Sequence, residues 1–235
     1  MLTGLDRLGL EVKYLDRARD FYEGRLGLDP TSVTETAVGY RVGDTDLVLR
    51  RPTEAPRGGL HVHYAFTTPA DEYDDWLDSL ADLDPAEYTF GSYRSLYVDD
   101  PDDHCVEIGG IDGDGGESSE TGLTGIFEVV LEVGHLARAE AFYTALGFEV
   151  VDRGDERHRV RLRGPFDLEL WEPQLGLADA RGGVHVDLTL AVDDPAEAVA
   201  AVVGWCDEPI AVSESGKRGL RVRDPDGHLV TFVET

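Results

Sequence analysis

Residues 12–28 read VKYLDRARDFYEGRLGL, and residues 131–148 read LEVGHLARAEAFYTALGF. Each stretch leads from an extended run into a short amphipathic helix that ends at a glycine, as helices commonly do. The pair Phe21-Tyr22 of the first stretch returns as Phe142-Tyr143 in the second, at an offset of 121 residues (142 − 21). Because both pairs fall on the apolar face of their helix, we expect them to pack in the core.

The repeat extends along the whole chain. GGLHVH at 58–63 returns as GGVHVD at 182–187, and DPDDH at 100–104 returns as DPDGH at 224–228, both at an offset of 124 (182 − 58 and 224 − 100). So regular a period indicates two homologous halves. Between them residues 111–121, IDGDGGESSET, are glycine, serine and acid with almost nothing apolar, which predicts a solvated linker. We therefore predict one domain over residues 1–110 and a second over residues 122–235.

Each half repeats one order of local patterns twice: a strand, a helix and then paired strands. The opening strands show apolar residues at alternate positions, 8, 10 and 12 in one half and 129, 131 and 133 in the other. Helices are predicted over 16–26, 72–80, 135–146 and 196–203. Further strands are predicted over 37–42, 46–50, 61–67, 93–98, 105–108, 157–162, 167–171, 185–192, 219–223 and 229–233. This order predicts an α+β fold of four modules, with helices packed on one face of curved sheets.

The composition is strongly acidic, with 48 Asp and Glu residues against 21 Lys and Arg and a formal net charge of −27. Such a surface repels nucleic acid and anionic membranes, so neither is expected as a partner. The excess of aspartate and the near absence of lysine (only Lys13 and Lys217) resemble the proteome of a salt-accumulating halophile. Most of the carboxylates are then expected to serve solvation rather than chemistry.

The two cysteines, Cys105 and Cys206, do not occupy matching positions in the halves and show no metal-ligand spacing. This pattern predicts a reduced, intracellular protein. The N-terminus lacks the apolar core of a signal peptide, and no apolar run approaches the roughly 20 residues that span a bilayer. We expect a cytoplasmic protein that binds a small-molecule ligand and exists as a monomer or a homodimer.

Three motifs, in this order, resemble the vicinal oxygen chelate (VOC) superfamily, which includes glyoxalase I, bleomycin and fosfomycin resistance proteins and extradiol dioxygenases. They are the two helix stretches quoted above, then GGLHVHYAF and GGVHVDLTL, and finally DPDDHCVEI and DPDGHLVTF. The resemblance implies tandem VOC domains built from four βαβββ modules, whose curved mixed sheets enclose cups. Four modules in one chain look like the extradiol dioxygenase branch.

The resemblance also implies a ligand pattern for one divalent metal. In the dioxygenases the ligands are a histidine on the first strand, a histidine on the fifth and a glutamate on the eighth, a set suited to Fe(II). Glyoxalase-like members add or substitute an acid on the fourth strand. In this chain the three dioxygenase positions are Arg7, His63 and Glu107 in the first half, and Glu128, Asp187 and Thr231 in the second. Neither half keeps the full triad.

For the first cup, three interpretations remain open. His61 and His63 are two residues apart on a predicted strand and share a face, so with Glu107 they could form a metal site. Alternatively, Arg7 pairs with Glu107 and replaces the metal by a permanent cation. In the third interpretation, Arg7 binds an anionic group of a ligand.

For the second cup, Glu128, Glu169 and Asp187 are expected to converge, and His185 shares a face with Asp187. Carboxylates and an imidazole suit Mn or Fe, so the metal expected in either cup is Fe²⁺ or Mn²⁺, or none. Three buried carboxylates without a cation would force at least one to take up a proton. A metal, or an arginine partner from position 159 or 161, is therefore required.

The remaining histidines have simpler explanations. His104 and His228 follow the Asp-Pro-Asp turn, where they are expected to supply a residue that tolerates left-handed φ. His135 and His158 are expected at the surface. The chain contains no Ser/His/Asp order, phosphate-binding loop or dinucleotide motif.

Two functions follow as hypotheses. The first is a divalent-metal-dependent enzyme acting on a small molecule with vicinal oxygens, as a ring-cleaving dioxygenase or a glyoxalase-like lyase. The second is a metal-free protein that binds or sequesters a small molecule, as bleomycin resistance proteins do. The ligand positions discriminate between them, because only the first requires a competent metal site.

Overall fold

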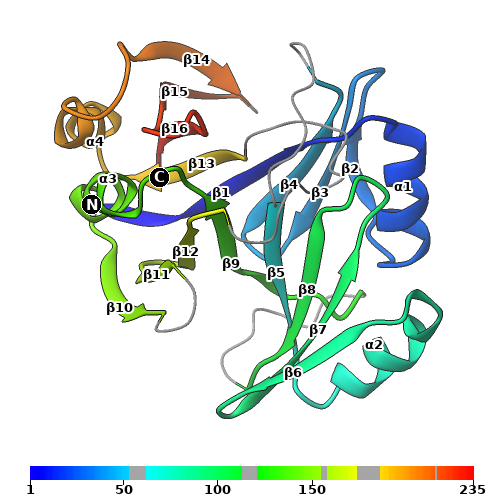
Figure 1. Ribbon diagram of the computed structural model, residues 1–235. Helices are drawn as coiled ribbons and strands as arrows, with labels where there is room; N and C mark the ends of the chain where they lie inside the picture. Colours follow the sequence, from blue (N-terminus) through cyan, green and yellow to red (C-terminus); the bar gives the residue numbers. More distant parts are fainter. Residues whose placement is uncertain (53–61, 113–120, 155–157, 174–185, 215) are drawn as a thin grey trace.

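The computed structural model describes residues 1–52, 62–112, 121–154, 158–173, 186–214 and 216–235 (Figure 1). Each half of the chain folds into two consecutive βαβββ modules, which confirms the predicted α+β class. Module 1 consists of β1 (Leu2–Glu11), α1 (Leu15–Gly24), β2 (Pro30–Val33), β3 (Ala37–Val42) and β4 (Thr45–Arg50). Module 2 consists of β5 (Val62–Thr68), α2 (Tyr73–Ser79), a 3-10 turn (Ala81–Leu83), β6 (Ala86–Phe90), β7 (Tyr93–Asp99) and β8 (Cys105–Gly110).

The second half repeats this order. Module 3 consists of β9 (Gly125–Glu132), α3 (Leu136–Ala145), β10 (Glu149–Arg153), β11 (Arg159–Arg163) and β12 (Asp167–Trp171). Module 4 consists of β13 (Asp187–Val192), α4 (Pro195–Val202), β14 (Ile210–Glu214), β15 (Lys217–Arg223) and β16 (Leu229–Glu234). In each module the first strand runs parallel to the last, which places the helix connection on one face of the sheet.

The sixteen strands form two eight-stranded mixed sheets, and each sheet takes one module from each half. Sheet A has the order β14-β15-β16-β13-β1-β4-β3-β2 and joins module 4 to module 1. Sheet B has the order β10-β11-β12-β9-β5-β8-β7-β6 and joins module 3 to module 2. Antiparallel pairs join the modules, β1 with β13 and β5 with β9. The assignment of one cup to each half of the chain is therefore wrong, because every cup draws on both halves.

This pairing brings the two ends of the chain together (Figure 1). Leu2 at the start of β1 lies opposite Val192 at the end of β13. The N-terminal amine of Met1 lies 2.8 Å from Oδ2 of Asp193. The hydroxyls of Thr3 and Thr235 are 2.9 Å apart. The first and last modules are thus held together by strand pairing and by these terminal contacts.

The core lies between the helices and the sheet faces that they cover, and it is a continuous apolar cluster. Phe21, Tyr22, Phe142 and Tyr143 are all buried in it, so the prediction that these pairs serve packing is confirmed. Their rings meet edge to face, with centroids 5.2 Å apart in the first pair and 5.0 Å in the second. The opposite, concave faces of the sheets carry the polar side chains described below.

Local patterns indicated two strands after each helix, and the structure has three. The additional strands, β2, β6, β10 and β14, lie at the four outer ends of the sheets. β2, β6 and β10 are exposed at every residue. They have no buried face, so they lack the apolar alternation by which strands are found in a sequence.

The Asp-Pro-Asp turns also differ from expectation. The residues with left-handed φ are Asp103 (61°) and Gly227 (95°), one position before each histidine. His104 and His228 are themselves buried, at 1% and 2% exposure. The prediction that these histidines supply the left-handed position is wrong. The predicted surface positions of His135 and His158 are confirmed, because both are exposed.

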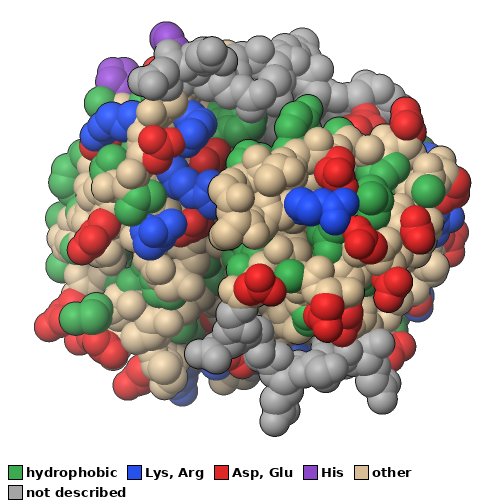
Figure 2. Space-filling view, turned by 90° about the horizontal axis from the view of Figure 1, so that it is seen from below, with side chains coloured by type: hydrophobic (Ala, Val, Ile, Leu, Met, Phe, Trp, Pro, Cys, Tyr) green, Lys and Arg blue, Asp and Glu red, His purple; other side chains and the backbone are tan. Residues whose placement is uncertain are grey.

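Acidic side chains are spread across the face of the molecule seen from below (Figure 2). The largest group of basic side chains gathers on the left of that face, the side on which Figure 1 places β10 to β12. Within the described part of the chain, no helix has the length and apolar character needed to cross a membrane.

Candidate metal site

Three strands at the centre of sheet B bring a histidine and two glutamates together. His63 lies on β5, Glu107 on β8 and Glu128 on β9. Ala65, two residues after His63 and on the same face of β5, pairs with Glu107 on one side and with Glu128 on the other. Its methyl side chain leaves the space between the two carboxylates open. The pairing register of the three strands therefore directs one histidine and two glutamate side chains toward the same point.

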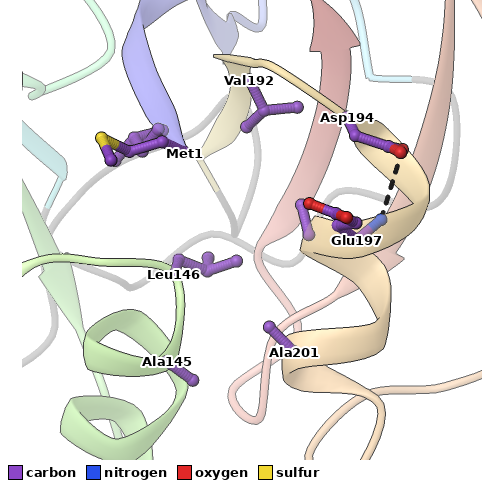
Figure 3. A pocket seen from close by; sticks show the side chains of 9 residues that line it. Met1, Ala145, Leu146, Val192, Asp194, Glu197 and Ala201 are labelled. Atoms are coloured by element: carbon purple, nitrogen blue, oxygen red, sulfur yellow. Dashed lines mark hydrogen bonds between the residues drawn. The ribbon is translucent and has the colours of Figure 1, made fainter.

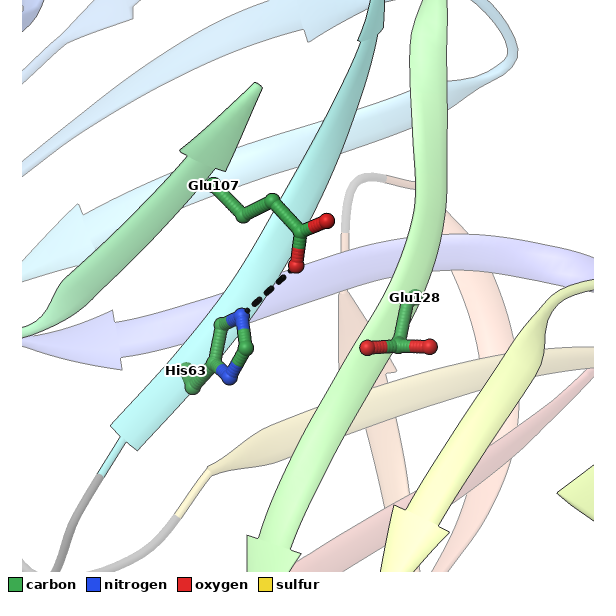
Figure 4. Close-up of side chains that lie close together, drawn as sticks. All are labelled: His63, Glu107 and Glu128. Atoms are coloured by element: carbon green, nitrogen blue, oxygen red, sulfur yellow. Dashed lines mark hydrogen bonds and ion pairs between the residues drawn. The ribbon is translucent and has the colours of Figure 1, made fainter. Parts of the chain in front are cut away.

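The three side chains point toward one another in the cup (Figure 4). One potential ligand atom from each lies within 4.8 Å of the others. Nε2 of His63 is 3.0 Å from Oε2 of Glu107. His63, Glu107 and Glu128 are only 5%, 2% and 4% exposed, so the cluster is shielded from bulk water. Its atoms are close enough to share one ion.

Glu128 is the least satisfied member of the cluster. Its Oε2 is buried and accepts no hydrogen bond, although Nη2 of Arg161 lies 2.5 Å away in an ion pair. Arg161 also contacts Asp167 at 2.9 Å and Glu169 at 3.4 Å, so one guanidinium is shared among three carboxylates. Burial raises the pKa of Glu128 to about 8, with Glu169 adding to the effect and Arg161 opposing it.

Glu169, the acid on β12, is engaged differently. Its Oε2 accepts a hydrogen bond of 2.7 Å from the indole nitrogen of Trp171. Its Oε1 lies 3.2 Å from Arg159 and 3.4 Å from Arg161. Glu169 belongs to the same cup, but it is not part of the group within mutual coordination distance. Glu169 is therefore a carboxylate next to the cluster and not one of its three members.

Two aromatic side chains that sequence reasoning missed flank His63. The ring of Tyr97 lies 5.6 Å from the imidazole centroid and that of Trp171 lies 6.3 Å away, both edge to face. Tyr97 on β7 pairs directly with Glu107 on β8. Burial, together with Glu107, raises the pKa of Tyr97, so its hydroxyl remains a donor. The strand register could have identified Tyr97, because it lies directly opposite Glu107 and therefore faces the same cup.

The other predicted site residues lie elsewhere. Arg7 and Asp187 are on β1 and β13 of sheet A, where Nη2 of Arg7 donates to Oγ1 of Thr189 at 3.1 Å. The predicted pairing of Arg7 with Glu107 is therefore wrong, and so is the grouping of Asp187 with Glu128 and Glu169. Of the two arginines expected to pair with the buried carboxylates, Arg159 and Arg161, it is Arg161 that contacts Glu128. His61 and His185 lie outside the described residues.

A pocket at the outside of the molecule is unrelated to either cup (Figure 3). It lies where the chain start meets the ends of β13 and α3 and the side of α4, and its lining is mainly apolar. Its acid Asp194 caps α4 by accepting hydrogen bonds from the backbone amides of Ala196 and Glu197, at 2.7 Å and 3.3 Å. That carboxylate is committed to the helix, so the pocket offers little chemistry.

The residues of the sheet B cup fit a divalent cation. With Glu128 ionised, Glu107, Glu128, Glu169 and Asp167 supply four negative charges, and Arg159 and Arg161 supply two positive ones. A dication would balance this difference and would be held among the ligand atoms of His63, Glu107 and Glu128. One imidazole and two carboxylates form a hard donor set that suits Mn²⁺ or Fe²⁺.

The sequence matches the Glyoxalase/Bleomycin resistance protein/Dioxygenase superfamily over residues 4–108 and 125–232. Fold, cup and sequence together define a two-domain protein of the vicinal oxygen chelate type. The chain belongs to this superfamily, and both halves contribute to the match.

Solved structures with the same fold carry names from two branches of that superfamily. One is a "putative dioxygenase" from Bacillus subtilis, with a TM-score of 0.79 and 16% identity, matched over 99% of this chain and 85% of its own length. Another is glyoxalase I from Zea mays, with a TM-score of 0.70 and 17% identity, matched over 98% of this chain and 92% of its own. At these identities the likeness establishes the fold alone.

Proposed function

We propose that the protein is a divalent-metal-dependent enzyme that acts on a small molecule carrying two neighbouring oxygens. The ion would be held in the sheet B cup by His63, Glu107 and Glu128. The proposal is carried by one observation, the convergence of one ligand atom from each of these three buried side chains within 4.8 Å of the others. The Zea mays and Bacillus subtilis structures supply a precedent for the fold only.

Such an ion supplies Lewis acidity toward the two substrate oxygens and, if it is Fe²⁺, a site for dioxygen in ring cleavage. Three protein ligands leave coordination positions open for the substrate. The Tyr97 and Trp171 rings, which flank His63, would keep water away from it.

Metal analysis tests this proposal. Protein loaded with Fe²⁺ or Mn²⁺ and then desalted should retain about one ion per chain by elemental analysis. His63→Ala and Glu128→Gln should each weaken retention at least tenfold, since each removes a ligand from a small donor set. Asp187→Asn, at the position homologous to His63 in sheet A, is the matched control and should retain the ion. Oxygen uptake with 1,2-diphenols then tests the ring-cleaving reaction.

The second candidate, a metal-free small-molecule binder, is favoured by Arg161. Its guanidinium already contacts Glu128, Asp167 and Glu169 and could take the place of a metal. Under this alternative the wild-type protein retains no ion, and Arg161→Gln gains the ability to bind one. Wild-type protein without stoichiometric metal, or with metal that His63→Ala leaves in place, would rule out the enzyme as proposed.

A further inference from the structure

The cup of sheet A occupies the same place in its sheet as the candidate metal site, but its chemistry is different. The homologous positions carry Arg7 in place of Glu128, Asp187 in place of His63, Thr231 in place of Glu107 and Val48 in place of Glu169. Among the residues that the structure describes, no group of metal-ligating side chains converges there. Two further arginines, Arg50 on β4 and Arg221 on β15, reach into this cup.

The three arginines of this cup are held in place by neighbouring side chains. Nη2 of Arg7 donates to Oγ1 of Thr189 at 3.1 Å, and Nε of Arg221 donates to Oγ1 of Thr231 at 2.9 Å. Thr189 and Thr231 are adjacent across β13 and β16, so the register positions both guanidiniums on the same face. The preorganised fork of an arginine loses less freedom on binding an anion than a mobile side chain would.

Asp187 forms two long ion pairs with these arginines. Nη2 of Arg221 is 3.7 Å from its Oδ1, and Nη2 of Arg50 is 3.8 Å from its Oδ2, both beyond hydrogen-bond distance. Its side chain is 7% exposed, and its Oδ1 accepts no hydrogen bond from the described residues. A buried carboxylate oxygen in this state is an acceptor that still requires a donor. Gly9 opposite leaves room for it, since a methyl there would meet the Asp187 Cβ at 3.0 Å.

Among the described residues, this cup is richer in arginine than in acid, the reverse of the metal site. Arg7, Arg50 and Arg221 share it with Asp187 and Glu11. The described ion pairs at the rim are each neutral; they are Asp6 with Lys217 and Asp46 with Arg41. In a chain with a net charge of −27, three arginines gathered in one cup favour an anionic ligand there.

We propose that the sheet A cup is a second ligand site, which binds a small carboxylate bearing a hydroxyl or amino group on the neighbouring carbon. The arginines supply the fork that binds the carboxylate. Oδ1 of Asp187 accepts the hydrogen bond of the adjacent hydroxyl or amino group. The same aspartate disfavours sulfate, because a dianion without a donor would face a carboxylate oxygen. This site is independent of the metal proposed for sheet B.

Calorimetric titration of EDTA-treated protein at fixed ionic strength tests the site, with sodium lactate as the probe. Lactate should bind saturably, propionate, which lacks the hydroxyl, at least tenfold more weakly, and lactamide, which lacks the charge, not measurably. Arg221→Gln should weaken lactate binding at least tenfold. Arg163→Gln, an exposed arginine of sheet B, is the matched control and should leave it unchanged. If Arg221→Gln proves unfolded, Thr231→Val removes only the acceptor that orients Arg221 and should still weaken binding severalfold.

The variant Asp187→Asn tests recognition of the hydroxyl group separately from recognition of the carboxylate. It should bring lactate and propionate to within about threefold of each other, because an amide oxygen is a weaker acceptor than a carboxylate oxygen and the repulsion of a bare carboxylate is relieved. His63→Ala should leave lactate binding unchanged, so this site and the metal site fail separately. The proposal is overturned if no saturable lactate binding is seen, if sulfate binds more tightly than lactate, or if His63→Ala rather than Arg221→Gln abolishes binding.

Discussion

At the scale of single residues, the two cups differ because a few homologous positions carry side chains of opposite charge. Ala65 in sheet B separates two glutamates, whereas its counterpart Thr189 in sheet A holds an arginine. The two cups have equivalent backbone positions, so the difference between them lies in their side chains. A duplicated scaffold tolerates this divergence because cup residues contribute little to the apolar core.

Sequence reasoning found most of these residues but not their neighbours. His63, Glu107, Glu128 and Glu169 were all identified from motif positions, and the need for Arg159 or Arg161 followed from charge. Their assembly into one cup could not be predicted, because it depends on β5 pairing with β9, across the boundary between the halves. Local patterns contain no information on which strand edges meet.

The protonation of Glu128 gives a test at this scale. Its pKa is about 8 in the folded protein against an ordinary value of 4.5, so between these pH values the folded state holds a proton that the unfolded state has released. The free energy of unfolding of metal-free protein should therefore fall as pH rises from about 5 to about 8. Glu128→Gln should remove that contribution and be more stable than wild type at pH 9, by an order of a few kcal/mol at most, at about 1.4 kcal/mol per pKa unit.

Urea denaturation at pH 5.5 and pH 9 measures the effect. Glu197→Gln on α4 is a suitable control, because that side chain lies away from both cups and should show no such pH dependence. Added Mn²⁺ should reverse the order at pH 9, since wild type then gains binding energy that Glu128→Gln cannot. A Glu128→Gln protein that is no more stable than metal-free wild type at pH 9 would contradict the burial argument.

At the scale of elements, the strand-turn-strand unit that closes each half is organised by a buried aspartate. Oδ1 of Asp100 accepts from the backbone amides of Asp102 and His104, at 2.8 Å and 3.0 Å. Oδ2 of Asp100 accepts from Tyr22 at 2.9 Å and lies 3.0 Å from Nδ1 of His104. The turn has nearly the same sequence in both halves because its first aspartate forms an Asx-type turn and also accepts a hydrogen bond from a tyrosine of the helix.

The two copies of this turn use their histidines differently. In the second half Asp224 again accepts from two backbone amides and from Tyr143, at 2.8 Å. Nδ1 of His228, however, accepts from the amide of Val186, and its Nε2 donates to the carbonyl of Glu132. His228 is therefore a neutral bridge between backbone groups, whereas His104 pairs with a carboxylate. Sequence reasoning placed both turns but gave no means of distinguishing the histidines.

The His104–Asp100 pair predicts a pH effect of its own. Burial alone would lower the pKa of His104, but Asp100 outweighs it and raises that pKa above the ordinary 6.5. Stability from the charged pair is then complete below pH 6.5 and is lost as pH rises through the folded pKa. His104→Gln should be destabilised most at pH 6, on the order of 1–3 kcal/mol, with the deficit shrinking toward pH 9. Thermal and urea unfolding measure it.

The repeat supplies the matched variant, His228→Gln. It removes two hydrogen bonds made by a neutral ring, so its deficit should persist at pH 9. Equal pH dependence of the two variants would show that the Asp100 contact does not require a charged imidazole.

At the scale of the whole molecule, the sequence halves and the structural sheets do not coincide. The repeat correctly predicts four modules, and the resemblance correctly predicts their internal order. Neither the repeat nor the resemblance predicts which modules share a sheet. The structure pairs the first module with the last and the two middle modules with each other. The pairing strands, β1 with β13 and β5 with β9, lie at the centre of each sheet, where loss of a partner leaves a row of backbone N–H and C=O groups unpaired.

This arrangement makes a last prediction, that residues 1–110 alone do not form a folded monomer. That fragment keeps β1 to β8 but leaves the inner edges of β1 and β5 without the strands that pair with them, in both sheets at once. Expressed alone it should show no cooperative thermal transition as a monomer, whereas mixing it with residues 122–235 should restore the native near-UV spectrum in a one-to-one complex. Metal retention is a second readout, because His63 and Glu107 come from one fragment and Glu128 from the other; each fragment alone should fail to retain the ion and the complex should recover it. A fragment 1–110 that melts cooperatively as a monomer would mean that each half can pair its own two modules, and the sheets described here would then be one of two available pairings.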